Sequence, residues 1–139
     1  MNSYEGEGAI LLENAVQDYD PALLKIYVRP GDDGIVPTNV LWANLFKDFL
    51  DGLEKEEIIL NFLFTLANVI IKMAELKGTR IIALSGGVFQ NTVLVDMVNE
   101  LSENKFELFF NRNLASNDEN IAIGQLMYYT HCIDQQKKE

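Results

Sequence analysis

The chain has 139 residues, 48% hydrophobic and 23% charged, a composition that favours one globular domain over residues 1–139 and excludes a wholly disordered chain. Its formal net charge of −10 gives a surface that repels phosphodiester backbones, which argues against direct binding of nucleic acid. The single cysteine, Cys132, allows no internal disulfide and no cysteine zinc site, and it fits a reducing cytoplasm.

Neither export nor membrane insertion is expected from the sequence. The acidic first residues, 1–7, lack the basic start and apolar stretch of a secretory signal. The most apolar stretch, Ile58–Ile71, contains two asparagines and is shorter than the roughly 20 residues that span a bilayer. We therefore expect a cytoplasmic protein in which this stretch is a buried helix.

The N-terminal third is predicted to form a helix followed by a hairpin. Apolar residues at helical spacing indicate a helix over Glu7–Tyr19, and Asp20-Pro21 should end it because proline disfavours a helical residue before it. Leu23–Val28 has the composition of a strand, and a turn-rich segment separates it from the short Ile35–Val36. A β-hairpin is the structure that this pattern favours.

The middle of the chain is predicted to form two helices of the core. The first is capped by Thr38 or Asn39 and ends at Gly52. It carries aromatic residues at helical spacing, which favours packing in the core over a base-stacking platform: Trp42, Phe46 and Phe49. The second runs from Leu53 or Glu54 to Leu76 and is apolar on more than one face, so it should be the most buried helix.

The C-terminal half alternates strand and helix, which predicts a parallel βαβ unit with one further helix. The expected fold is therefore α/β, with a largely parallel sheet and antiparallel strands added by the hairpin. The four expected elements are Arg80–Leu84, Asn91–Glu103, Phe106–Phe110 and Asn117 to about Asp134.

Ser85-Gly86-Gly87 follows the first of these strands and has the layout of a phosphate-binding turn. Glycines let a ligand approach the backbone, and amides at the start of the following helix point their positive ends outward. A tight turn with no ligand is the alternative, and Ser-Gly-Gly by itself favours it.

The second candidate segment, 115–120, follows the next strand and should emerge at the same edge of the sheet. Ligands of open α/β sheets bind at the carboxyl ends of the strands. Asp118 has the carboxylate of a metal ligand, but capping of the last helix by Asn117 or Asp118 is the commoner role for these residue types.

Three segments in order resemble motifs of the HypF hydrogenase-maturation carbamoyltransferases. They are Tyr4-Glu5-Gly6 with Ala9 and Leu12-Glu13, then Ser85–Asn91, and finally Asn117-Asp118 with Ile121–Gln125. The resemblance implies the second lobe of an actin-like, ribonuclease H-like ATPase domain, with a mixed, largely parallel sheet and helices on both of its faces. It also implies that the chain is part of a longer enzyme and inactive by itself.

In that family, carbamoyl phosphate and ATP give carbamoyl adenylate, whose carbamoyl group passes to the C-terminal cysteine of a HypE-like partner. The resemblance implies that Ser85, Gly86 and Gly87 face the nucleotide phosphates. Asn91 would fix the nucleotide, and Gly6 and Glu13 would lie on its ribose side. Asp118 would bind a divalent metal, whose other ligands lie outside this chain. No nucleophile is assigned.

Two departures from the family pattern leave alternatives open. Glu119 and Asn120 stand where the family has glycines, which puts a tight phosphate approach at that loop in doubt, and Leu63 replaces a histidine often found in the long helix. The alternatives are a lobe of an enzyme related to the tRNA threonylcarbamoyladenosine transferases and a non-catalytic interaction module.

Overall fold

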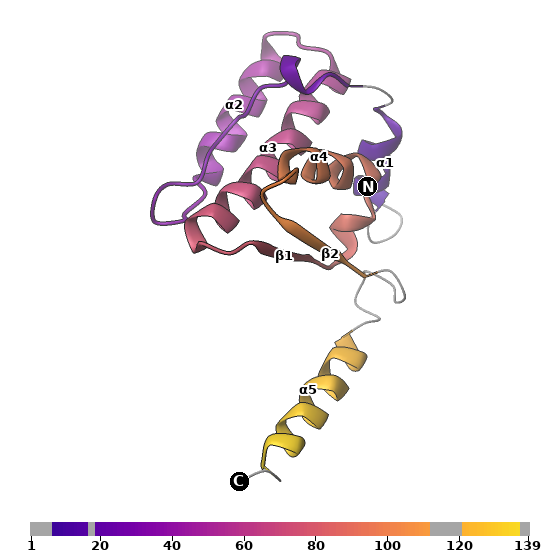
Figure 1. Cartoon of the computed structure of the whole chain (residues 1–139). Coiled ribbons are helices and arrows are strands. Elements are labelled where there is room, and N and C mark those ends of the chain that lie inside the picture. Colours follow the sequence, from indigo (N-terminus) through magenta and orange to yellow (C-terminus); the bar gives the residue numbers. More distant parts are fainter. Residues whose placement is uncertain (1–6, 17–18, 112–120, 137–139) are drawn as a thin grey trace.

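The computed structural model describes residues 7–16, 19–111 and 121–136 (Figure 1). The described elements, in chain order, are α1 (Glu7–Asn14), the 3₁₀ turn η1 (Pro21–Leu23), α2 (Thr38–Leu50), α3 (Lys55–Lys77), β1 (Ile81–Leu84), the 3₁₀ turn η2 (Gly87–Gln90), α4 (Thr92–Ser102), β2 (Glu107–Phe110) and α5 (Ile121–Gln136). The predicted α/β class is confirmed by these elements.

The predicted βαβ unit is confirmed. Strands β1 and β2 pair in parallel, with Ile81 opposite Glu107 and Leu84 opposite Phe110, and α4 connects them. Because both strands run in the same direction, the loops that follow them leave at one edge of the sheet.

The main core lies between the two strands and the helices α3 and α4. Its buried apolar side chains include Ile82 and Leu84 of β1, and Leu94, Met97 and Val98 of α4. Alternate residues of β1, Ile81 and Ala83, are exposed instead. Among the described residues, α3 and α4 therefore cover one face of the sheet. No described helix covers the other face, where the family resemblance implies further helices.

Helix α3 forms the centre of the molecule, as its composition predicted. Glu56 and Glu57 lie in its first turn, and Gly78 ends it in the left-handed conformation at φ 63°. Among the described helices, α3 alone has the length and hydropathy to cross a bilayer, but half of its most apolar window is buried inside the molecule. That burial is typical of a core helix.

The predicted hairpin is wrong. No strand forms in the described residues before Ile81, and helix side chains bond the backbone of the predicted strand instead. The amide N–H of Lys25 donates to Asn61 Oδ1 at 2.9 Å, and that of Tyr27 donates to Thr65 Oγ1 at 2.9 Å. The first helix is also shorter than predicted, because α1 ends at Asn14.

The prediction that the aromatic residues of α2 lie in the core is also wrong. Trp42 is 54% exposed, Phe46 58% and Phe49 56%, and the rings of Trp42 and Phe46 lie 6.4 Å apart between centroids. The buried side of α2 carries Leu41 and Asp48. The helix is therefore rotated so that the side with Leu41 and Asp48 faces the molecule and the side with the three aromatic residues faces outward.

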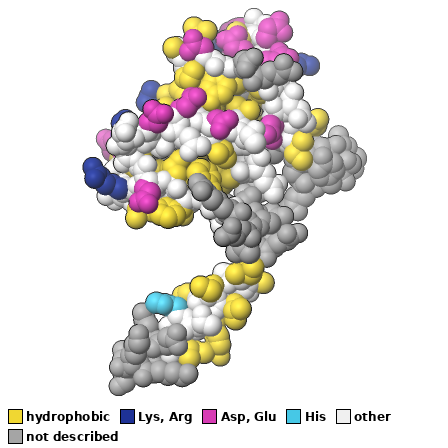
Figure 2. All heavy atoms as spheres, turned by 45° about the vertical axis from the view of Figure 1, so that its right-hand side comes forward, with side chains coloured by type: hydrophobic (Ala, Val, Ile, Leu, Met, Phe, Trp, Pro, Cys, Tyr) yellow, Lys and Arg dark blue, Asp and Glu magenta, His cyan; other side chains and the backbone are white. Residues whose placement is uncertain are grey.

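Helix α5 projects away from the rest of the molecule (Figure 1). Every residue from Ile121 to His131 is exposed. Figure 2 shows hydrophobic side chains along its visible side, outside the compact part of the chain. Its apolar residues are therefore uncovered by the described part of the chain.

Candidate functional site

The carboxyl edge of the two-stranded sheet brings Ser85 and Asn111 together. Leu84 pairs with Phe110, so the next residue of each strand lies at the same level. The amide nitrogen Nδ2 of Asn111 donates a hydrogen bond to Ser85 Oγ at 3.0 Å. Sequence reasoning placed Ser85 at the site but missed Asn111, whose position directly after β2 was the available signal.

Gly86 adopts a backbone conformation that requires glycine. Its φ of 107° and ψ of 157° lie in a region from which side chains are essentially excluded. A Cβ built on either Gly86 or Gly87 would meet no heavy atom of the described structure within 4 Å. The two glycines of this turn therefore have open space where a side chain would begin.

The α-helix does not begin directly after the glycines, in contrast to the predicted layout. The 3₁₀ turn η2 comes first, and α4 begins at Thr92. Asn91 is the N-cap of α4, with its Oδ1 accepting a hydrogen bond from the amide N–H of Leu94 at 2.9 Å. It is 4% exposed, so the residue predicted to fix a nucleotide lies below the surface of the turn.

The side chain of Glu13, a residue of α1, contacts the beginning of α4. One of its carboxylate oxygens, Oε1, accepts a hydrogen bond from the Thr92 amide N–H at 3.1 Å and another from the Thr92 hydroxyl. A carboxylate at a helix N-terminus is stabilised by the macrodipole and by unpaired amides. The structure thus joins Glu13 of α1 to Thr92, the first residue of α4 and the neighbour of Asn91 in sequence. The predicted site residues Gly6 and Asp118 lie outside the described residues.

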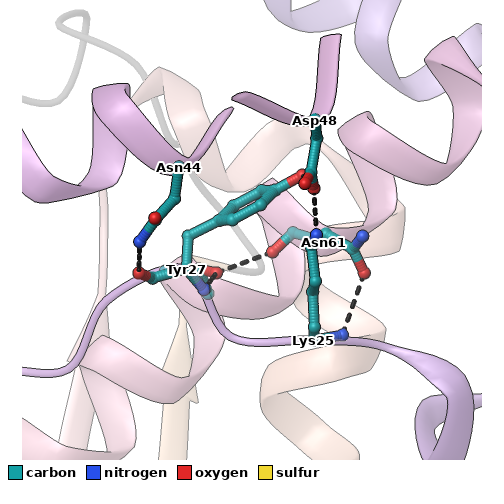
Figure 3. A network of polar contacts seen from close by, with 6 residues as sticks. Lys25, Tyr27, Asn44, Asp48 and Asn61 are labelled. Atoms are coloured by element: carbon teal, nitrogen blue, oxygen red, sulfur yellow. Dashed lines mark hydrogen bonds and ion pairs between the residues drawn. The ribbon is translucent and has the colours of Figure 1, made fainter. Parts of the chain in front are cut away.

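A second polar cluster, unpredicted from the sequence, anchors the segment from Lys25 to Tyr27 (Figure 3). The Tyr27 hydroxyl donates to Asp48 Oδ2 at 2.8 Å, and the Lys25 ammonium forms an ion pair with the same carboxylate. Asn44 Nδ2 donates to the Tyr27 carbonyl oxygen at 2.7 Å. These contacts attach an irregular segment to α2, and the bonds to Asn61 and Thr65 attach it to α3.

The titration behaviour of this cluster follows from its geometry. Burial alone would raise the pKa of Asp48, but hydrogen bonds from Lys25 and Tyr27 and the charge of Lys25 outweigh it and lower the pKa. Burial, and then the hydrogen bond to Asp48, raise the pKa of Tyr27. The Asp48 carboxylate is therefore charged and paired, which suits a structural anchor better than an acid–base catalyst.

Within residues 7–16, 19–111 and 121–136, no three histidine, cysteine or acidic side chains lie close enough to hold a metal ion. At the edge of the sheet, the described donors are the Ser85 hydroxyl, the Asn111 amide and the glycine backbone. These neutral groups suit an oxygen-rich anion such as a phosphate, because each offers hydrogen-bond donors.

Comparison with known proteins gives matches over most of the chain. The model of the family described as "Carbamoyltransferase, Kae1-like Domain, second subdomain" matches residues 1–125. The carbamoyltransferase HypF of Synechocystis is 31% identical over 133 residues, which cover 90% of this chain. Because the match covers 16% of that relative, the chain spans about a sixth of its length.

Two solved structures share the fold. HypF of T. kodakarensis superimposes with a TM-score of 0.67 at 23% identity, covering 84% of this chain and 16% of its own. A full-length HypF in a phosphate- and nucleotide-bound form gives a TM-score of 0.66 at 27% identity, covering 89% of this chain and 17% of its own. Both agree with the α/β, actin-like fold expected from the sequence.

Proposed function

Because the chain belongs to the HypF carbamoyltransferase family, as the second subdomain of its Kae1-like domain, we propose that it supplies one wall of an ATP site in a larger enzyme. In this proposal, the turn from Ser85 to Gly87 holds the phosphates. The first subdomain supplies the opposite wall. Asn91 and Glu13 accept hydrogen bonds from the first amides of α4, the helix that follows the turn, and so fix its position.

The open backbone at Gly86 is the observation that carries this proposal. A chain with a net charge of −10 repels phosphate at long range, so binding needs local donors. The turn offers backbone without Cβ atoms at the carboxyl edge of parallel strands, where α/β proteins bind their ligands. The nucleotide-bound relative, 27% identical, adds support.

The reaction proposed for the complete enzyme is the transfer of a carbamoyl group from carbamoyl adenylate, made from carbamoyl phosphate and ATP, to a HypE-like protein. The thiolate of that partner's C-terminal cysteine attacks the carbamoyl carbon. A carbon–sulfur bond forms, and the bond to the phosphate oxygen breaks, so that AMP leaves with the electron pair. Donors of the turn would stabilise the charge on the leaving phosphate.

A divalent metal fits this proposal only if other parts of the enzyme supply further ligands. Asp118 would contribute one carboxylate, and a single carboxylate does not hold a divalent ion firmly. When bound, the metal would neutralise phosphate charge. The proposed contribution of this chain to the site is otherwise made by neutral donors and by backbone.

The first test measures ATP binding by calorimetry to the complete Kae1-like domain. Ser85→Ala and Asn111→Ala should each weaken binding by about two- to tenfold, because each removes one hydrogen-bonding group worth roughly 0.5–1.5 kcal/mol. Asn99→Ala is the matched control, since Asn99 is exposed on α4 away from the turn. Unchanged affinity in both site variants would contradict the proposed phosphate site.

The second test concerns the division of the site between subdomains. The 139-residue chain alone should bind ATP weakly or not at all and transfer no carbamoyl group, because it holds only part of the contacts. Micromolar binding by the chain alone would refute the shared site.

The third test concerns Asp118. In the complete enzyme, Asp118→Ala should strongly reduce carbamoyl transfer to the HypE-like acceptor without changing the circular dichroism spectrum. Transfer at the wild-type rate would leave Asp118 with the role of a helix cap.

A further inference from the structure

The outward side of α2 is a continuous apolar stripe. Its four side chains are more than half exposed: Trp42, Phe46, Phe49 and Leu50. They recur at intervals of three and four residues, so they lie on one side of the helix. Figure 1 shows α2 at the edge of the molecule, beside α3. The stripe is therefore available to a partner.

The area of the stripe is that of a small interface. An aromatic side chain covers about 150–250 Å², and the three in the stripe are 54–58% exposed, while Leu50 is 80% exposed. Together the four side chains present roughly 400–500 Å² of apolar surface, which is large for one exposed patch. Two such surfaces would bury roughly 800–1,000 Å², within the range of weak, reversible complexes and below that of permanent ones.

The stripe is symmetrical about Phe46. Trp42 lies four residues before Phe46, and Leu50 lies four residues after it. If two α2 helices run antiparallel around a twofold axis at Phe46, this ring meets its own copy, and Trp42 of each chain meets Leu50 of the other. Each copy then supplies the surface that the other requires, which is the condition for an isologous dimer. The intervals of four and three residues from Trp42 to Phe49 are also those of the apolar seam between paired helices.

The distribution of charge favours an antiparallel pair. Residues 34–46 carry no charge, whereas residues 51–57 carry four acidic side chains and one lysine. The first turn of α2 has no acidic residue and no side-chain cap, so nothing in that turn neutralises its partial positive charge. In an antiparallel pair, the acidic end of each helix lies beside the positive end of the other. A parallel pair would bring the two acidic ends together, which is unfavourable in a chain of net charge −10.

We propose that two copies of this chain associate through the stripe on α2, with the helices antiparallel and Phe46 at the twofold axis. The dimer is reversible, with a dissociation constant in the micromolar range, because the buried area is small. The proposal goes beyond the proposed function and does not depend on it.

Analytical ultracentrifugation of the 139-residue chain over a range of concentrations measures the association. Wild type should change from monomer to dimer as the concentration rises. Phe46→Glu should weaken the dimer by about a hundredfold, because it places two like charges against each other at the axis. Leu126→Glu, at an exposed apolar position on α5, is the matched control and should leave the dissociation constant unchanged. Circular dichroism reports whether each variant is folded.

Disulfide cross-linking tests the orientation and keeps Phe46 in place. In a Cys132→Ser background, a chain with Trp42→Cys should cross-link to a chain with Leu50→Cys more readily than either chain cross-links to itself. Asn99→Cys, at an exposed position of α4, should not cross-link to itself.

Four results would overturn the inference: a chain that stays monomeric at every concentration, a dimer that a folded Phe46→Glu variant does not weaken, a dimer that Leu126→Glu weakens as much, or preferred cross-linking of Trp42→Cys to itself. Loss of ATP binding by the complete Kae1-like domain would refute the proposed function and leave this inference intact.

Discussion

Replacing Thr65 by valine tests how the segment from Lys25 to Tyr27 is held. Thr65 is fully buried in α3, and its hydroxyl accepts a hydrogen bond from the Tyr27 amide N–H at 2.9 Å. The same hydroxyl donates to the Asn61 carbonyl oxygen at 2.7 Å. Valine has nearly the same shape, so Thr65→Val removes both bonds without opening a cavity.

The expected cost comes mainly from the Tyr27 amide, which would lose its partner inside the molecule. A buried donor without a partner costs about 1–3 kcal/mol. The Asn61 carbonyl belongs to a helix, so the loss of its extra donor should add little. We therefore expect Thr65→Val to lower the free energy of unfolding by about 1–3 kcal/mol.

Urea unfolding followed by circular dichroism measures this free energy, provided that the slope against urea is unchanged. Thr130→Val is the matched control: Thr130 also donates to a carbonyl of its own helix, that of Met127, but it is exposed. It should remain within roughly 0.5 kcal/mol of wild type. A Thr65 variant as stable as this control would refute the idea that α3 side chains replace strand pairing.

Three further predictions concern the anchor, the turn and the core. The lowered pKa of Asp48 means that its stabilisation is present above the unfolded-state pKa of about 4 and is lost as the pH falls through the folded-state value. The stability difference between wild type and Asp48→Asn should therefore shrink in urea titrations as the pH falls from about 5 through the lowered folded-state pKa; a constant difference would be inconsistent with the ion pair to Lys25. Gly86→Ala should cost about 1–3 kcal/mol because of its backbone conformation, whereas Gly87→Ala, with open space and no positive φ, should be nearly neutral; equal thermal shifts would contradict this. Met97→Ala, at a fully buried position, should cost about 2–5 kcal/mol by chemical denaturation, and a loss below about 1 kcal/mol would place Met97 outside the core.

The sequence by itself determined the elements whose signals are local. The alternation of strand and helix after Arg80, the apolar composition of α3 and the glycine at its end depend on short-range preferences, and all are confirmed. The glycine turn at Ser85 was also located correctly, because only glycine suits the backbone angles observed at Gly86.

Only the tertiary structure decided which partners the other segments use. Residues 41, 45 and 48 of α2 have the same helical spacing as Trp42, Phe46 and Phe49, so periodicity does not distinguish the two stripes. Contacts of Asn44 and Asp48 with Tyr27 orient the helix, and they join residues 17 and 21 positions apart.

The same reason explains the wrong hairpin and the missed Asn111. The hydrogen bond of a backbone amide can be accepted equally well by a neighbouring strand or by a side chain such as Thr65. The composition of a segment does not determine which of these acceptors lies next to it. Asn111 meets Ser85 only because parallel pairing of β1 and β2 aligns two strand ends 26 residues apart. Local preference determined the elements, and contacts between distant residues determined the orientation of α2, the course of the segment from Lys25 to Tyr27 and the pairing of Ser85 with Asn111.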